Sequence, residues 1–186
     1  MDLLKELSNT GTNYFSNRAA SNIHEFYLNG DIEESKEYIE WFDIIRRAPA
    51  TDVVKIYINS MGGDLFTAIQ FMRVITESEA TVMVSVEGAC MSAATMIFLC
   101  GDIFEVSDHT MFMFHNYSGG TFGKGGEMYD NIVHEREWSE NLLKSVYKDF
   151  LNDSEIDSIL NNKDIWMDGK TVVDRLEKKA MKVKRK

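Results

Sequence analysis

VMVSVEGACMSAATMIFLC, residues 82–100, is the stretch that decides the fold. Its first five residues alternate and are β-branched, which predicts a strand. The residues from Thr95 onward are apolar enough to form a buried helix. The small residues between them bring Ser92 to the start of that helix, where backbone N–H groups have no partner inside the helix. A serine at such a corner is typical of a serine hydrolase that holds an oxyanion on these groups. The alternative is a helix cap, since serine is a favoured N-cap residue.

Strands and helices alternate along most of the chain, which predicts an α/β fold with a mostly parallel sheet. The single proline, Pro49, ends one predicted helix, and residues 29–30 and 60–64 are predicted turns. No internal repeat or linker divides the chain, so residues 1–186 are expected to form one domain, with a polar N-terminal segment at 1–22 and a basic tail at 177–186. The expected strands are 23–28, 53–59, 81–87, 103–106 and 110–115, and the expected helices are 32–48, 65–76, 92–100, 127–151 and 153–161.

Composition places the chain among ordinary globular proteins. It has 186 residues, 44% of them hydrophobic and 27% charged. No apolar run approaches the ~20 residues that span a bilayer, and residues 1–7 lack the features of a signal peptide, so a cytoplasmic location without membrane contact is expected. The net charge is −10 although six of the last nine residues are basic. The acidic body argues against nucleic-acid binding. The basic tail is expected to be a solvated, frayed end, with contact to an acidic partner as the alternative.

The two cysteines suggest neither a disulfide nor a metal site. Cys90 and Cys100 are expected on one helix, roughly 15 Å apart, and cannot pair with each other. No metal-ligand spacing is present, so no metal or organic cofactor is expected. Cys90 is expected to be a small buried residue rather than a nucleophile.

A nucleophilic serine needs a base, a carboxylate that orients the base, and N–H donors for the oxyanion. His115 ends an apolar strand, where catalytic side chains are often displayed. His134 is expected to face solvent, His109 lies in a turn, and His24 stays possible as the base. Gly62 and Gly63 follow the strand 53–59 and can bring backbone N–H groups close to a ligand, although glycine pairs also form plain turns.

Three motifs together resemble the proteolytic subunit of the ATP-dependent Clp protease (ClpP). Residues 57–63, YINSMGG, are similar to the family's segment before its oxyanion glycine. Ser92 and His115 fall where the family has its nucleophile and its base. Asp164, in the segment KDIWM, resembles the acid of the triad, with Asp168 four residues away as the competing carboxylate. The resemblance implies that the N–H groups of Gly63 and Ala93 form the oxyanion hole.

The resemblance also implies an architecture and an activity. The fold would be a ClpP/crotonase-like head of repeated β-β-α units, with a projecting strand and helix, the handle, at about 117–151. Handles in this family interlock two seven-membered rings into a tetradecameric barrel with the active sites inside. The chain would then be a serine endopeptidase that binds unfolded polypeptides in extended form by β-augmentation. ATP would act only through a separate AAA+ unfoldase.

The chain departs from the family pattern in several places. Met61 replaces a proline, Asn116-Tyr117 replaces a glutamine-proline pair, and two residues are missing between the Ser92 helix and the His115 strand. The surface on which the family docks its unfoldase has lost apolar character, and an apolar loop would bury its carboxylates at a cost. We therefore expect docking of the usual unfoldase to be weak, absent or rebuilt around charge, in a diverged protein such as a bacteriophage encodes. The positions aligned with that surface are Lys55, Tyr57, Glu77, Ser85, Glu87, Phe104 and Val106.

Other functions stay open on sequence alone. A catalytically silent structural or regulatory subunit would keep the fold and join a related ring. A viral protease that processes capsid or scaffold proteins would act without an unfoldase. An acyl-CoA enzyme of the crotonase fold would use the backbone oxyanion hole without the triad, but the chain carries no positive signature for CoA.

Overall fold

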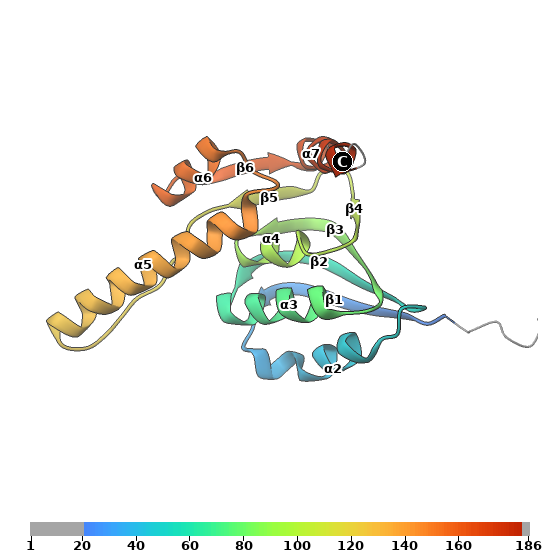
Figure 1. The fold of residues 1–186 in the computed structure, drawn as a ribbon, viewed down its shortest axis with the longest axis horizontal. Helices are drawn as coiled ribbons and strands as arrows, with labels where there is room; N and C mark the ends of the chain where they lie inside the picture. The colour runs from blue at the N-terminus through green and yellow to red at the C-terminus, as the bar shows by residue number, and fades with distance from the viewer. Residues whose placement is uncertain (1–20, 184–186) are drawn as a thin grey trace, which may run out of the picture.

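The computed structural model describes residues 21–183, so most of the N-terminal segment 1–22 and the end of the basic tail lie outside it. Its centre is a six-stranded sheet with the order β1-β2-β3-β5-β6, in which β4 also pairs with β3 (Figure 1). All pairs are parallel except β5 with β6. The strands are β1 (Ile23–Ile32), β2 (Val53–Gly63), β3 (Thr81–Met91), β4 (Ile103–Val106), β5 (Met111–Phe114) and β6 (Ile165–Asp168).

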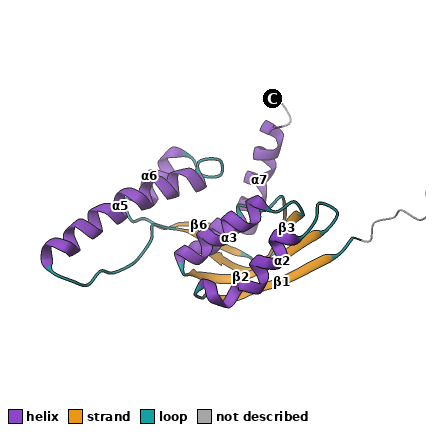
Figure 2. Cartoon of the chain, turned by 60° about the horizontal axis from the view of Figure 1, so that its bottom comes forward, coloured by secondary structure: helices purple, strands orange, loops and turns teal. Residues whose placement is uncertain are grey.

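Three helices cover one face of the sheet, as Figures 1 and 2 show. They are α2 (Ile39–Arg47), α3 (Leu65–Glu77) and α4 (Ala93–Phe98), and a short 3-10 helix, η2 (Ser35–Tyr38), leads into α2. Alternate residues of the strands point toward them: Ile56 and Val84 are fully buried, as are Phe71 of α3 and Phe98 of α4. This alternation follows from the two-residue period of a strand, and it makes one continuous core.

Helix α5 (Gly125–Tyr147) extends away from the sheet (Figure 1). Its buried residues, Ser139, Leu143 and Tyr147, all lie in its C-terminal part, so the helix rests on the body by this end alone. The chain then returns through α6 (Asp153–Leu160) and β6 to α7 (Gly169–Val183). None of the helices in residues 21–183 is long and apolar enough to cross a membrane.

The structure confirms the predicted α/β alternation but extends β1, β2 and β3 beyond their predicted ends. Residues 60–63 were expected to form a turn, yet Gly62 pairs with Asp31 and Gly63 with Ile32, so both strands continue. The predicted helix 32–48 is wrong at its start for the same reason. The Ile32 carbonyl accepts a hydrogen bond from the Asp64 N–H (2.8 Å), which holds Ile32 in the sheet.

Two further differences concern the last third of the chain. The described part of the basic tail, from Glu177 to Val183, is helical rather than frayed, because Val172 of α7 is buried in the core and anchors the helix. Residues 117–124, which begin the handle expected at about 117–151, form no strand in the described chain. They carry three glycines and have no neighbouring strand with which to pair.

Candidate active site

Ser92 occupies a strained corner between β3 and α4. Its backbone has φ 53° and ψ −130°, in a region that residues with side chains rarely adopt. The Ser92 N–H donates to the Met113 carbonyl (2.8 Å), and the Ser92 carbonyl accepts from the Thr95 N–H (3.0 Å). The Ser92 side chain makes no cap hydrogen bond to α4. A strained serine that does not cap its helix is a candidate nucleophile, since such strain clusters at functional sites.

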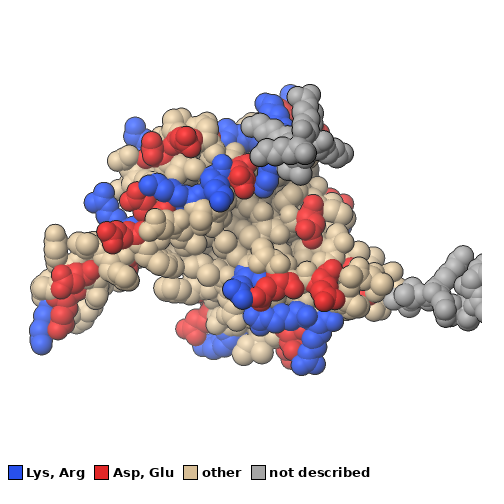
Figure 3. All heavy atoms as spheres, viewed as in Figure 1, with Lys and Arg blue, Asp and Glu red and all other residues tan. Residues whose placement is uncertain are grey.

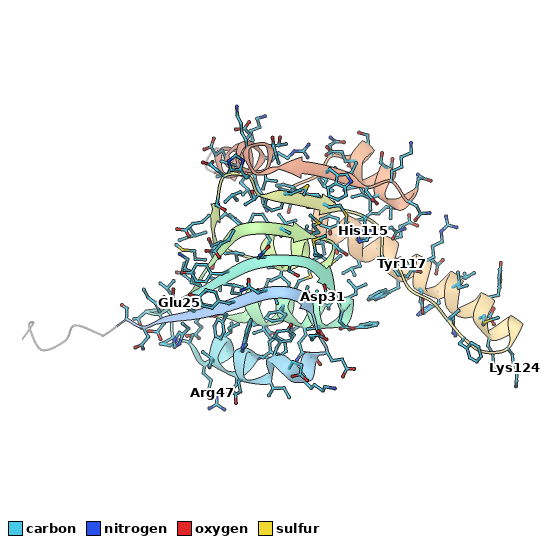
Figure 4. The ribbon with its side chains drawn as sticks, turned by 180° about the vertical axis from the view of Figure 1, so that it is seen from behind. Glu25, Asp31, Arg47, His115, Tyr117 and Lys124 are labelled. Carbon is cyan, nitrogen blue, oxygen red and sulfur yellow. The ribbon has the colours of Figure 1, made fainter. Side chains whose placement is uncertain are left out.

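His115 brings its ring to that serine. It follows the last residue of β5, a strand that pairs with the end of β3, so both residues emerge at the same edge of the sheet. The distance from His115 Nε2 to Ser92 Oγ is 2.6 Å. Figure 4 shows His115 and Tyr117 where the chain leaves β5 toward α5. Both Ser92 and His115 are partly exposed, so a substrate can reach them.

The two candidate carboxylates sit at opposite ends of β6. β5 and β6 are antiparallel and Phe114 pairs with Ile165, so continuing this register sets Asp164 opposite His115. No hydrogen bond joins Asp164 to His115 within residues 21–183. Asp168 pairs with Met111 at the far end of the strand.

Asp168 has a local structural task instead. Its Oδ1 accepts from the Thr171 N–H (2.8 Å) in the first turn of α7. Hydrogen bonding from the Thr171 side chain, and then from its backbone N–H, lowers the pKa of Asp168. Of the two carboxylates, only Asp164 is at the end of β6 that this register sets opposite His115.

Glycine is required at both positions of the Gly62-Gly63 pair. Gly62 has φ 106°, and a Cβ there would lie 2.6 Å from the Ser92 Cβ. Gly63 has φ 146°, and a Cβ there would run into the backbone of Ile32. The close approach of Gly62 fixes the glycine segment against Ser92. Ala93 is the first residue of α4, so its N–H has no acceptor within the helix.

A cavity of about 520 Å³ opens over these groups. Gly63, Ser92, Ala93 and His115 all line it. Its walls are largely apolar, and Phe66 stacks on Trp138 with 5.6 Å between ring centroids. The remaining apolar side chains that line it are Leu65, Met96, Leu142 and Leu143. Helix α5 supplies much of this wall through Trp138, Leu142 and Leu143. The sequence did not predict this role, because the apolar residues of α5 fit an ordinary helix face equally well.

The other candidate nucleophiles and bases lie elsewhere. His24 is at the start of β1, at the opposite end of the sheet from Gly63, where its Nε2 lies 2.9 Å from Asp52 Oδ2. His134 is exposed as predicted, although it also borders the cavity. Cys90 is fully buried, and burial raises the pKa of its thiol well above the ordinary value. Cys90 is therefore a core residue rather than a thiolate nucleophile.

The uncovered face of the sheet carries a cluster of paired polar and aromatic side chains. Lys55 Nζ lies 2.9 Å from Glu105 Oε2 and 4.7 Å from the centre of the Tyr57 ring. Tyr57 donates its hydroxyl to Glu25 (2.8 Å) and stacks on Tyr27. These contacts connect the lysine, the two tyrosines and the two glutamates into one cluster.

The prediction for two residues of β4 put them on the wrong side of the sheet. Phe104 and Val106 were expected on the surface with Lys55 and Tyr57, but they pack toward the core, where Phe104 lies 5.0 Å from the Phe98 ring. Glu105 takes the outward position, because a shift of one residue along a strand exchanges its two faces.

Charged side chains elsewhere are also paired. On the face in Figure 3, acidic and basic side chains lie beside one another. Examples are Arg47 with Asp43 on α2 (2.9 Å) and Arg73 with Glu77 on α3. Glu77, expected at the docking surface, thus has an ion-pair partner. Among the residues that the structure describes, no three His, Cys, Asp or Glu side chains form a potential metal site.

The chain matches a known protein family. The family model described as Clp protease matches residues 29–174, which is most of the chain and includes Gly63, Ser92, Ala93, His115 and Asp164. No curated protein matches the chain.

Proposed function

Because the chain belongs to the Clp protease family, we propose that it is a serine endopeptidase in which Ser92 is the nucleophile and His115 the general base. The observation that carries this proposal is the distance of 2.6 Å between Ser92 Oγ and His115 Nε2. A base within hydrogen-bond reach of the nucleophile is the first requirement for proton transfer. The strained backbone of Ser92 and the cavity that opens over its hydroxyl support the same assignment.

In the proposed reaction, Ser92 Oγ attacks the carbonyl carbon of a peptide bond while His115 Nε2 takes its proton. His115 then gives the proton to the leaving amine, and an acyl ester stays on Ser92. Water, deprotonated by His115, hydrolyses this ester and restores the serine. The N–H groups of Gly63 and Ala93 are the proposed oxyanion donors, and removing one such donor typically costs about 10²–10³-fold in rate.

Asp164 is the proposed third member of the triad. Its position opposite His115 in the β5–β6 register supports this role, and Asp168 is already engaged with Thr171. The Asp164 carboxylate would accept a hydrogen bond from the His115 Nδ1–H and would stabilise the imidazolium that forms during attack. A side-chain rotation of Asp164 toward His115 is then part of assembling the reactive site.

The proposed substrate is an extended, unfolded polypeptide with an apolar side chain next to the cleaved bond. The apolar cavity wall formed by Phe66, Trp138 and Leu142 supports this preference.

Assembly into rings of identical subunits is also proposed. The projecting half of α5 supports it with exposed Tyr129, Ile132 and Val133, which a single chain in water would leave uncovered. Any unfoldase partner would have to bind to the cluster formed by Lys55, the two glutamates Glu25 and Glu105, and the two tyrosines Tyr27 and Tyr57.

The test uses fluorogenic peptides, with hydrolysis by the purified protein compared with that of Ser92→Ala and both proteins sized by light scattering. We expect hydrolysis by a large oligomer, abolished in the variant, and covalent labelling of Ser92 by a fluorophosphonate. A wild-type protein that forms rings but neither labels nor cleaves would contradict the proposal and favour a silent subunit. Acyl-CoA binding without labelling would favour the crotonase alternative.

A further inference from the structure

Two buried hydroxyl groups connect the base of α5 to the backbone of Ser92. Thr95 Oγ1 lies 2.6 Å from the Ser92 carbonyl oxygen, and the Tyr147 hydroxyl lies 2.8 Å from Thr95 Oγ1. Both side chains are fully buried. A carbonyl oxygen only accepts hydrogen bonds, so Thr95 donates its single proton to Ser92 and accepts from Tyr147. Burial raises the pKa of Tyr147, which keeps its hydroxyl protonated as a donor.

These contacts act on a backbone that is held from both sides. The Ser92 N–H is fixed by the Met113 carbonyl of β5 (2.8 Å), and its carbonyl is fixed by the Thr95 N–H and hydroxyl. A backbone with φ 53° persists only where its surroundings hold it. The first turn of α4 already supplies the Thr95 N–H, so the Thr95 hydroxyl is the additional restraint.

Tyr147 also contacts the strand that carries His115. Its ring meets Phe114 edge-on, with 5.5 Å between centroids and an angle of 85°. Phe114 directly precedes His115. One side chain at the base of α5 therefore supports the serine through its hydroxyl and the histidine strand through its ring.

We propose that Thr95 and Tyr147 are positioning residues that hold Ser92 in reactive alignment with His115. The inference rests on the proposed function of Ser92 and adds two residues to it. Misplacement of reacting atoms by about 1 Å can cost on the order of 10²-fold in rate. Loss of either hydroxyl removes a restraint that keeps Ser92 in this alignment.

The kinetic test removes each hydroxyl without changing the packing. We expect Thr95→Val to lower kcat for a fluorogenic peptide about tenfold, with KM within about twofold, and Tyr147→Phe to lower kcat about fivefold. The double variant should be no slower than Thr95→Val, because Tyr147 acts through Thr95. Thr95→Ser keeps the hydroxyl and should stay within about twofold of wild type.

Matched controls make the same chemical changes away from the site. Thr110→Val removes a buried hydroxyl that has no hydrogen-bond partner within the described residues. Tyr38→Phe removes a buried phenol hydroxyl that accepts from the Glu33 N–H. Both should keep the wild-type kcat. The proposal would be overturned if kcat fell as much in these controls as in Thr95→Val and Tyr147→Phe. It would also be overturned if kcat of the double variant fell by the product of the two single-variant losses.

A second measurement does not depend on activity. Crystal structures of Thr95→Val and Thr95→Ser report the distance from Ser92 Oγ to His115 Nε2. We expect it to lengthen beyond about 3.5 Å in the valine variant and to stay within hydrogen-bond range in the serine variant. An unchanged distance and an unchanged Ser92 φ in Thr95→Val would overturn the positioning role. If the wild-type protein is inert, the proposed peptidase function fails, while these structures still decide whether Thr95 positions Ser92.

Discussion

Gly62 offers a direct test of how the nucleophile is placed, through the substitution Gly62→Ala. The added Cβ would lie 2.6 Å from the Ser92 Cβ, 3.0 Å from the Met91 carbonyl oxygen and 3.2 Å from Ser92 Oγ. Ordinary contacts of a Cβ begin near 3.4 Å. Ser92 and the glycine segment must therefore separate by about 0.8 Å, which breaks the alignment of Ser92 with His115.

The expected effects on rate and on stability differ in origin. A displacement of this size in a reacting atom predicts a fall in kcat/KM of about 10²-fold. A non-glycine residue at φ 106° also carries strain of roughly 1–3 kcal/mol, which lowers the free energy of unfolding. Gly30→Ala separates the two effects, because Gly30 has φ 84° but no atom within 4 Å of the place that an added Cβ would take.

The assay is hydrolysis of a fluorogenic peptide, with the free energy of unfolding measured in urea on the same preparations. We expect both variants to lose stability and only Gly62→Ala to lose activity. Equal activity in Gly62→Ala and Gly30→Ala would refute the argument that contact with Gly62 positions Ser92.

Four further substitutions test individual contacts. Asp164→Asn should lower kcat by at least about 10²-fold with little change in stability, whereas Asp168→Ala, which removes the acceptor of the Thr171 N–H, should lower the melting temperature and keep kcat, so the opposite pattern would exchange their roles. Glu155→Gln should lower the free energy of unfolding by about 1 kcal/mol at pH 7, because Arg175 donates two hydrogen bonds to Glu155 (2.7 and 2.8 Å). These bonds lower the pKa of Glu155 in the folded protein, so its stabilisation is present above the ordinary value of 4.5 and is lost as the pH falls through the lowered folded value; urea titrations at pH 7 and pH 3 should differ accordingly. Phe98→Ala should cost about 3–5 kcal/mol, since Phe98 is fully buried between the Phe104 and Phe112 rings, and a loss under about 1 kcal/mol would contradict its place in the core.

Local patterns predicted much of the fold. Strand alternation in 53–59 and 81–87 and helical spacing in 65–76 are set by side-chain periods of 2 and 3.6 residues, which a sequence displays directly. The strand-to-helix corner at Ser92 is equally local, because strand alternation gives way to small residues and then to an apolar run within residues 82–100. The Clp protease match over residues 29–174 confirms the family that the three motifs indicated.

β6 and α7 were not predicted from the sequence. The pattern of β6 is too short to recognise, and the burial of α7 depends on elements that are distant in the chain. β6 has only four residues, too few to show alternation, and it forms because β5 offers an open edge. α7 resembled a charged tail because its basic residues dominate the composition, while its burial depends on Val172 reaching a core built by other elements. The outward face of β4 was misassigned because strand register is fixed by pairing rather than by composition.

The residue types available to the site can be read from the chain alone: a serine at a corner, a histidine at a strand end, a glycine pair and two nearby carboxylates. How these groups meet depends on tertiary packing. The antiparallel pairing of β5 with β6 makes Asp164, rather than Asp168, the neighbour of His115. Packing of the base of α5 against α4 joins Tyr147 to Thr95, 52 positions apart in the chain. Such contacts depend on how separate elements pack and pair. The local spacing of apolar residues predicts a strand or a helix, but it does not predict which distant residues come into contact.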